Sequence, residues 1–243
     1  MKTTGNTILI TGGGTGIGFA LAEQFLKLGN KIIICGRRES RLKEASGKLD
    51  IPYIVCDVTE SAERIKMAEW IRANHPQTNI LINNAGIQHS YDLIKPVDPE
   101  LVRKECETNF IAPVHLGSLF IEQLTGKENA AIINISSGLA FTPLAFMPVY
   151  CATKAALHSF SLSLRHQLLK TGIKVFEIAP PTVDTELDRG KRDSRSNSYR
   201  GIKPEEFAVE AIEAIRNDKF EAGIGQAENL RIKREEMFGM LNH

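Results

Sequence analysis

The segment Thr11–Gly18 restricts the fold more than any other part of the sequence. It holds five glycines in eight residues and follows the short apolar run Thr7–Ile10. The residues that come next are apolar at the spacing of one helical face: Ile17, Leu21, Phe25 and Leu28. We therefore predict a buried strand, a glycine turn and a helix, in that order.

This arrangement is suited to binding the pyrophosphate of a dinucleotide. Glycines let the backbone turn sharply and approach the phosphates, which then lie at the positive end of the helix. The spacing is Gly12-x3-Gly16-x-Gly18, which differs from the commonest Rossmann fingerprint. A glycine cluster also occurs in ordinary loops, so this segment alone leaves both interpretations open. Its candidate cofactor-binding residues are Gly12, Gly14, Thr15, Gly16, Ile17 and Gly18.

Length and composition favour one cytoplasmic α/β domain. A chain of 243 residues can bury a full core, and its 30 basic and 29 acidic residues give no reason to expect nucleic acid or an anionic membrane as partner. No apolar run is long enough to span a bilayer, and we expect no signal peptide. The four cysteines form no C-x-x-C pair, and the histidines show no ligand spacing on a shared face except His158, which lies eight residues before His166. We therefore expect no metal and no disulfide frame.

Apolar runs alternate with helical patterns along the rest of the chain. Further strands are predicted at Lys31–Cys35, Pro52–Asp57, Asn79–Asn83, Ala131–Ile135, Ile173–Ile178 and Phe220–Ile224. Helices are predicted between them, among them one at Ser40–Lys48, one capped by Thr59, one at Pro204–Asn217 and a charged one at the C-terminus. This alternation predicts a Rossmann-type α/β fold: a doubly wound parallel sheet of about seven strands, in a single domain over residues 1–243.

Ligands of such sheets bind at the carboxyl ends of the strands. In this sequence those ends carry Gly12–Gly18, Gly36–Arg38, Asp57, Asn83–Gly86, Ser136–Ser137 and Pro180–Thr185. Polar and glycine residues therefore gather at one edge of the predicted sheet, as a binding site requires.

Tyr150 and Lys154 lie four residues apart at the start of a predicted helix, so both project from one face. A phenol has a pKa near 10, about three units too high for a base at neutral pH, and a neighbouring ammonium lowers it. The pair alone also fits a buried tyrosine beside a solvated lysine. Ser137 follows a predicted strand, where its hydroxyl can polarise a substrate oxygen.

The glycine turn, Asn83–Gly86, Ser137 and Tyr150-x-x-x-Lys154 occur in this order, and together they resemble the short-chain dehydrogenase/reductase family in its single-domain form. The resemblance implies hydride transfer between a nicotinamide and a small-molecule carbonyl or alcohol. It implies that Tyr150 exchanges the substrate proton, that Lys154 holds the nicotinamide ribose and lowers the pKa of Tyr150, and that Ser137 binds the reacting oxygen. Asn109 matches the family's fourth member, which holds a water between Lys154 and solvent.

The end of the second strand bears on the choice of cofactor. NAD enzymes usually carry an acidic residue there, whereas this chain reads Gly36-Arg37-Arg38, with no carboxylate before Glu39. Two guanidiniums suit a 2′-phosphate, so we predict NADP(H), with NAD(H) as the alternative. Arg37 and Arg38 also fit a solvated pair at the start of a helix. The resemblance implies further cofactor contacts from Asp57, Val58, Asn84, Ala85, Gly86, Pro180, Val183 and Thr185, besides Tyr150 and Lys154.

A narrower resemblance is carried by Tyr150–Phe160 and Ala179–Thr185, which are similar to the DltE-type oxidoreductases of bacteria. This group is named for an association with D-alanylation of teichoic acids. The broader family usually has Pro-Gly where this chain has Pro180-Pro181. A second proline fixes φ and removes a donor beside the nicotinamide.

The substrate and the assembly are less constrained by the sequence. Apolar side chains between Ser137 and Tyr150 fit either the wall of a pocket for an apolar carbonyl or alcohol, or a core or interface: Leu139, Phe141, Leu144, Phe146 and Met147. The basic stretch within residues 184–202 is interpreted as a flexible substrate lid, with a solvated loop as the alternative. The resemblance also implies a homodimer or homotetramer, formed through residues 100–123 and 150–170.

Two functions from different classes are compatible with these features. The first is an NADP(H)-dependent oxidoreductase. The second is an NADP(H)-binding regulatory or assembly protein without turnover, with a role in teichoic acid D-alanylation as one form of it. Ser137 opposite Tyr150 argues against the second, because a sensor needs neither. An epimerase or dehydratase of the same superfamily is disfavoured by the length of the chain.

Overall fold

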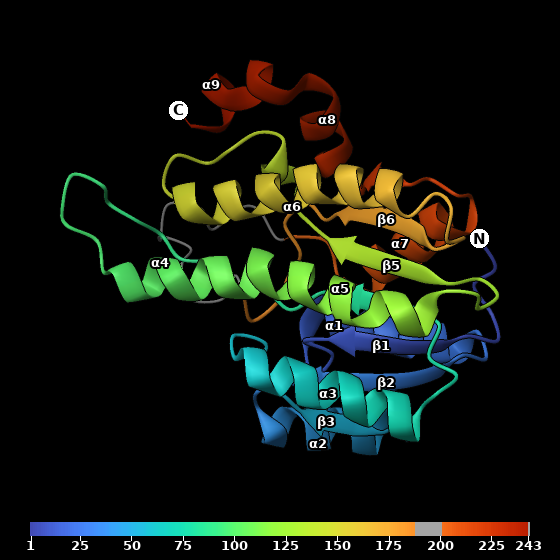
Figure 1. Cartoon of the computed structure of the whole chain (residues 1–243). Helices are drawn as coiled ribbons and strands as arrows, with labels where there is room; N and C mark the ends of the chain where they lie inside the picture. The colour runs from blue at the N-terminus through green and yellow to red at the C-terminus, as the bar shows by residue number, and fades with distance from the viewer. Residues whose placement is uncertain (188–200, 243) are drawn as a thin grey trace.

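The computed structural model describes residues 1–187 and 201–242. Its strands are β1 Thr7–Thr11, β2 Lys31–Gly36, β3 Tyr53–Val55, β4 Ile80–Asn83, β5 Ala131–Ile135, β6 Lys174–Ala179 and β7 Glu221–Gly223. They form one sheet in the order β3-β2-β1-β4-β5-β6-β7, with every neighbouring pair parallel (Figure 1). The predicted Rossmann-type sheet of about seven strands is confirmed.

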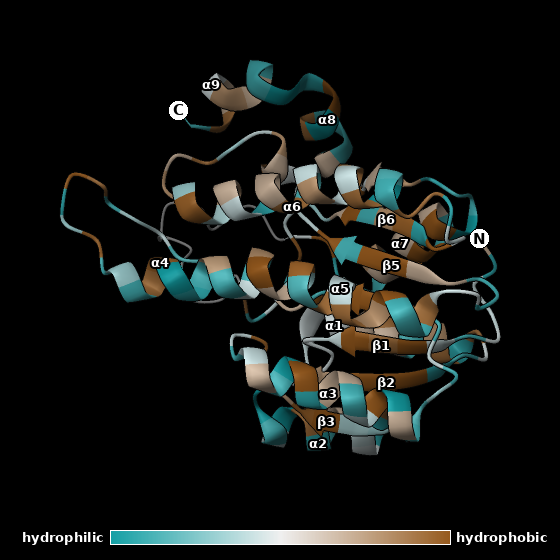
Figure 2. Ribbon diagram, in the orientation of Figure 1, coloured by the Kyte–Doolittle hydropathy of each residue, from teal (hydrophilic) through white to brown (hydrophobic). Residues whose placement is uncertain are grey.

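The central strands are mostly apolar because both faces of the sheet are covered. All residues of β1 and of β5 are buried, and β1 is drawn in brown, the apolar colour, in Figure 2. Parallel strands joined by crossover helices are buried in this way, which explains why they appear in the sequence as continuous apolar runs.

Two layers of helices cover the sheet. One layer contains α1 Gly16–Lys27, α2 Glu39–Leu49 and α7 Pro204–Arg216, and their apolar residues share one core cluster. The other contains α3 Ser61–Asn74, α4 Pro99–Cys106, α5 Ala112–Leu124 and α6 Pro148–Gln167 (Figure 1). A π-helical turn, Glu107–Ile111, joins α4 to α5, and 3-10 turns lie at Gly138–Ala140 and Arg234–Met237. The C-terminal helices are α8 Gln226–Lys233 and α9 Phe238–Leu241.

The cap predicted for the third helix was wrong. The residue before α3 is Glu60, and no side chain caps the helix. The Thr59 hydroxyl instead donates to Asp57 Oδ1 at 2.9 Å, and the Thr59 amide donates to the same oxygen at 3.0 Å. The Asp57 carboxylate therefore holds the turn after β3 and engages the hydroxyl that was expected to cap the helix.

The topology places a ligand crevice between β1 and β4. The chain leaves β1 towards β2 and β3 on one side, and β4 begins the other half of the sheet. Ligands of open α/β sheets bind at this switch point, outside the carboxyl ends of the strands.

Most of the predicted lid, residues 188–200, lies outside the described residues. The two ends of the segment are joined: Ile202 N donates to Thr182 O at 3.1 Å, and Asp184 N donates to Ile202 O at 3.0 Å. Among the described residues, no helix has the length and apolar character that crossing a membrane requires.

Candidate active site

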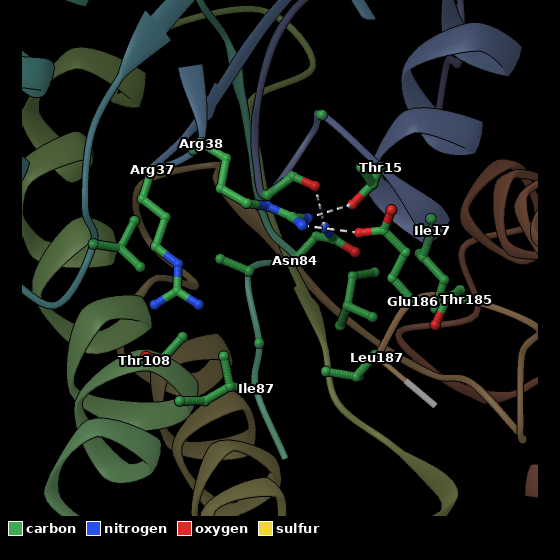
Figure 3. Close-up of a pocket in the computed structure, with 18 of the residues that line it drawn as sticks. Thr15, Ile17, Arg37, Arg38, Asn84, Ile87, Thr108, Thr185, Glu186 and Leu187 are labelled. Carbon is green, nitrogen blue, oxygen red and sulfur yellow. Dashed lines mark hydrogen bonds and ion pairs between the residues drawn. The ribbon is translucent and has the colours of Figure 1, made fainter. Parts of the chain in front are cut away.

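A cleft of about 410 Å³ lies at the carboxyl ends of the strands. Most residues predicted to bind the cofactor line it: Gly12, Gly14, Thr15, Gly16, Ile17, Arg37, Arg38, Asp57, Val58, Asn84, Ala85, Gly86, Tyr150, Lys154, Pro180 and Thr185. Arg41, Ile87, Thr108, Glu186 and Leu187 also line it and were not predicted (Figure 3). The fold thus brings most of the predicted set to one place.

The glycine turn is shaped by close approach. Gly12 and Gly16 have φ of +66° and +55°, in the left-handed region that favours glycine. Gly18 does not line the cleft; a Cβ there would lie 2.4 Å from Gly12 O and 2.5 Å from Asn84 Nδ2. Gly18 therefore lets α1 pack against the turn.

The N-terminus of α1 is open to an anion. Its cap residue, Thr15, makes no side-chain capping bond, and the first turn holds no acidic residue. The first amides of a helix have no partner within it, and the helix dipole favours negative charge there.

Asn84 ties the loop after β4 to the glycine turn. Its Nδ2 donates to Thr11 O at 2.9 Å, while Thr11 Oγ1 accepts from the amides of Asn84 and Ala85 at 3.0 Å each. These bonds fix the two halves of the crevice against each other.

Three arginines, Arg37, Arg38 and Arg41, line the part of the cleft at the end of β2 and the start of α2. Arg38 Nη1 and Arg41 Nη2 both contact the Glu186 carboxylate, at 2.9 and 2.7 Å, and Arg38 Nη2 donates to Thr15 Oγ1 at 3.3 Å. Arg37 extends instead towards Ile87 and Thr108 (Figure 3). Arg41 could have been found from its position in the first turn of α2, three residues after Arg38, the residue that precedes the helix.

Tyr150 and Lys154 lie in the first half of α6 with only 6% and 4% of their surfaces exposed. Lys154 Nζ donates to Ile135 O at 2.9 Å and lies 5.8 Å from the centroid of the Tyr150 ring. Ser137 caps the 3-10 turn, and its Oγ accepts from Leu139 N at 3.1 Å. The three side chains come from the end of β5 and the helix packed over it.

Burial is the largest influence on the pKa values of Tyr150 and Lys154. It raises the pKa of Tyr150 to about 12, although a hydrogen bond with the Ser137 hydroxyl acts in the opposite direction. It lowers the pKa of Lys154 to about 8, against the charge of Glu177, which favours the ammonium. At neutral pH the described site therefore holds a protonated phenol beside an ammonium.

Asn109 is fully buried within the π-helical turn. Its Oδ1 accepts from Ile87 N at 2.9 Å, and its Nδ2 donates to Ile87 O at 2.8 Å and to Thr153 Oγ1 at 3.1 Å. The side chain thus holds the loop that follows β4 against α6. π-helical turns are frequent at functional sites, and the water implied for this residue stays a prediction.

Some predicted residues lie elsewhere. Val183 belongs to the core and does not line the cleft. Phe141 is buried with its ring 4.8 Å from that of His158, and Phe146 is 47% exposed, whereas Leu139, Leu144 and Met147 pack around Tyr150.

One group of possible metal ligands was missed by the sequence spacing. His158, Glu177 and Glu221 lie with ligand atoms within 4.8 Å of one another. They come from α6, β6 and β7, so no local motif reveals them. Each residue has at least one of these atoms in an ion pair: His158 Nδ1 contacts Glu177 Oε2 at 2.7 Å, and Arg231 contacts Glu221 Oε1 at 3.0 Å.

Comparison with known proteins gives a consistent result. Residues 6–196 match the family model of the short chain dehydrogenases. The chain is 49% identical over 233 residues to the protein named uncharacterized oxidoreductase DltE of Bacillus subtilis, covering 95% of this chain and 92% of that one.

Solved structures agree with the fold. A short chain dehydrogenase of Burkholderia cenocepacia in complex with NADP superposes with a TM-score of 0.83 and 25% identity, over 96% of this chain and 94% of that one. One from Burkholderia phymatum in complex with NAD gives a TM-score of 0.85 at 21% identity, over 100% and 97% of the two chains, a likeness of fold alone.

Proposed function

The chain belongs to the short chain dehydrogenase family, and from this membership we propose that it is an NADP(H)-dependent oxidoreductase acting on a carbonyl or alcohol. One observation carries the proposal: Tyr150 and Lys154 line the same cleft as the glycine turn and the arginines. A proton-transfer group and a dinucleotide cradle are thereby joined in one site.

The cleft fits a dinucleotide. At Gly16, which lines the cleft with φ of +55°, an added Cβ would lie 3.1 Å from Thr185 Cγ2, so glycine lets the turn and Thr185 approach each other closely at this edge of the cleft. The uncapped amides of α1 would bind that pyrophosphate, and Lys154 would hold the nicotinamide ribose. When bound, NADP(H) supplies or accepts the hydride at the nicotinamide ring.

The preference for NADP(H) rests on charge. The chain has no carboxylate from Gly36 to Arg38, where an acidic residue would bind the ribose hydroxyls of NAD. Arg38 and Arg41 converge on one carboxylate, that of Glu186, which supports the ability of this region to hold an anion such as a 2′-phosphate. The solved neighbours hold NADP in one case and NAD in the other, so the preference that we propose rests on the arginines alone.

The proton chemistry follows from the protonation of the site. With its pKa raised, the Tyr150 phenol is protonated at neutral pH and donates its proton to a carbonyl oxygen during reduction. The Ser137 hydroxyl accepts from Leu139 N and is hydrogen-bonded to Tyr150, so it lies beside the phenol where it could turn to the same substrate oxygen. The Lys154 ammonium stabilises negative charge that develops on the phenol.

The surroundings of Tyr150 favour an apolar substrate. Leu139, Leu144 and Met147 pack around it and offer little that would bind a charged group. We therefore propose that the substrate is an apolar aldehyde, ketone or diketone, or the corresponding alcohol.

The test is the consumption of NADPH and NADH against a panel of aldehydes, ketones and diketones, with Tyr150→Phe beside the wild type. We expect NADPH-selective turnover that Tyr150→Phe abolishes while NADPH still binds. Tyr53→Phe, which removes a hydroxyl from β3 outside the cleft, serves as the matched control and keeps full activity.

Two results would contradict parts of the proposal. Binding of NADPH without turnover on any carbonyl would favour a regulatory or assembly protein that binds the nucleotide. A preference for NADH would remove the role given to the arginines and leave the rest intact.

A further inference from the structure

A row of polar residues crosses the sheet beneath α6. Asn83, Asn134, Glu177 and Glu221 are consecutive partners in the register of β4, β5, β6 and β7. The row faces α6, because Asn134 Nδ2 donates to Ser161 Oγ of that helix at 2.9 Å. Polar residues at consecutive positions in an otherwise apolar sheet require a physical reason, since each costs free energy to bury.

Glu177 is the most costly member of the row. Its side chain is fully buried, and one carboxylate oxygen contacts His158 Nδ1 at 2.7 Å. The other oxygen, Oε1, has no hydrogen-bond partner in the part of the chain that the structure describes. A buried carboxylate with one oxygen unsatisfied does not add stability, so we look for its role in the neighbouring site.

His158 links this carboxylate to the catalytic face of α6. It follows Lys154 by one helical turn, so both side chains face the sheet at neighbouring levels. The hydrogen bond with Glu177 raises the pKa of His158, which favours an imidazolium beside this carboxyl group. Glu177 also faces Arg165 of α6 and Glu221 of β7, and Arg234 lies near His158 on its far side.

We propose that Glu177 is a positioning residue of the active site, whose buried carboxylate, held by His158, keeps Lys154 in its ammonium form. This inference rests on the proposed function, because it explains how that site keeps its cation. The direct partner of Lys154 is a neutral carbonyl, Ile135 O. Burial favours loss of a proton from the Lys154 ammonium, and the negative charge of Glu177 opposes that loss.

The Glu221 end of the row is held separately. Arg231 contacts Glu221 at 3.0 Å and Glu228 at 2.8 Å, while Glu221 lies 3.8 Å from His158. Glu221 forms an ion pair with an arginine, whereas the one ion-pair contact of Glu177 among the described residues is with the imidazole of His158. Glu221→Gln offers a matched control, because it is the charge of Glu177, and not that of Glu221, that acts on Lys154.

The experiment is a direct titration of Lys154 in protein carrying 13C-labelled lysine side chains, followed by NMR. Comparison with Lys154→Arg assigns the signal. We expect Glu177→Gln to lower the titration midpoint of Lys154 by about one pH unit. Glu177→Asp keeps the charge and should restore the midpoint, and Glu221→Gln should leave it near the wild-type value.

A double variant keeps the test possible if Glu177→Gln alone does not fold. In Glu177→Gln/His158→Gln two amides replace the ion pair, and we expect the titration midpoint of Lys154 to fall in this protein as well. An unchanged midpoint in either folded variant would overturn the proposal, and so would an equal fall in Glu177→Asp, which would assign the effect to shape. The titration does not require turnover. If the protein reduces no carbonyl compound, the proposed function is contradicted, but the titration of Lys154 still tests the role of Glu177.

The activity profile provides the second readout. If NADPH-dependent reduction is found, the pH at which its rate falls on the alkaline side should be lower in Glu177→Gln than in the wild type. Below that pH the KM for NADPH should be nearly unchanged. A purely structural role would lower the rate at every pH and leave the pH of the alkaline fall where it is.

Discussion

At the scale of single residues, Lys154 is buried where its charge is unfavourable. Burial lowers its pKa to about 8, below the value of a lysine in an unfolded chain. Between those two pH values the unfolded state binds more protons, so this residue's contribution to stability rises with pH. Below about pH 8 the folded protein carries the full cost of the buried ammonium.

We therefore expect Lys154→Met to raise the free energy of unfolding at pH 7 by about 1–3 kcal/mol while abolishing activity. The gain should shrink towards pH 10, because the wild-type amine is then neutral in the folded state. Urea denaturation of both proteins at the two pH values measures it. A variant less stable than the wild type at pH 7 would show that the Ile135 bond outweighs the desolvation.

Arg37 and Arg38 carry the prediction of cofactor choice. Both are exposed, so each contact with a 2′-phosphate is partly screened by solvent and contributes about 1 kcal/mol. We expect Arg37→Ala and Arg38→Ala each to weaken NADPH binding by about fivefold, and NADH binding little. Titration of the fluorescence of each reduced nucleotide gives both affinities.

Lys43→Ala provides the control for the arginine variants. Lys43 is an exposed cation on the same helix, paired with Glu39 and outside the cleft. It should change neither affinity. Equal losses for NADPH and NADH in the arginine variants would mean that these side chains act on a part common to both nucleotides.

At the scale of the element, the contact between α1 and the glycine turn depends on Gly18. A Cβ there would meet Gly12 O and Asn84 Nδ2 at distances that no packing tolerates, so α1 must move outward. We expect Gly18→Ala to lower the free energy of unfolding by about 1–3 kcal/mol and to weaken NADPH binding.

Gly47 in α2 is the matched control, because a Cβ there meets nothing within 4 Å. Gly47→Ala should stabilise the protein by about 0.5–1 kcal/mol through helix propensity alone. Thermal unfolding of the two variants gives both values. A Gly18→Ala protein as stable as the wild type would contradict the close packing described for the turn.

The elements were largely predictable because strands buried on both faces leave continuous apolar runs, as Ile32–Cys35 does in β2. The cap of α3 was not, because the Thr59 hydroxyl bonds to Asp57, and propensity carries no information about that competition. The π-helical turn around Asn109 was also invisible, since it depends on the bonds from Asn109 to Ile87 and Thr153.

At the scale of the whole molecule, the candidate site is divided into a local part and a part made by the topology. The local part consists of Gly12–Gly18, Ser137 and Tyr150-x-x-x-Lys154, which are short motifs and could be found in the sequence. The contact of Glu186 with Arg38 joins residues on opposite sides of the cleft, and only the fold brings them together. The pair of His158 and Glu177 depends in the same way on the register of β6 beneath α6.

The central claim concerns hydride transfer assisted by Tyr150, and transfer of a label tests it most directly. NADPH carrying deuterium at the transferable position of the nicotinamide would be incubated with a reducible carbonyl compound, and the product alcohol analysed by mass spectrometry. We expect deuterium on the carbinol carbon with the wild type, and none above background with Tyr150→Phe, although that variant still binds NADPH. Label transfer by Tyr150→Phe at the wild-type rate would contradict the role of this residue, and no transfer by the wild type to any carbonyl would contradict the proposed activity.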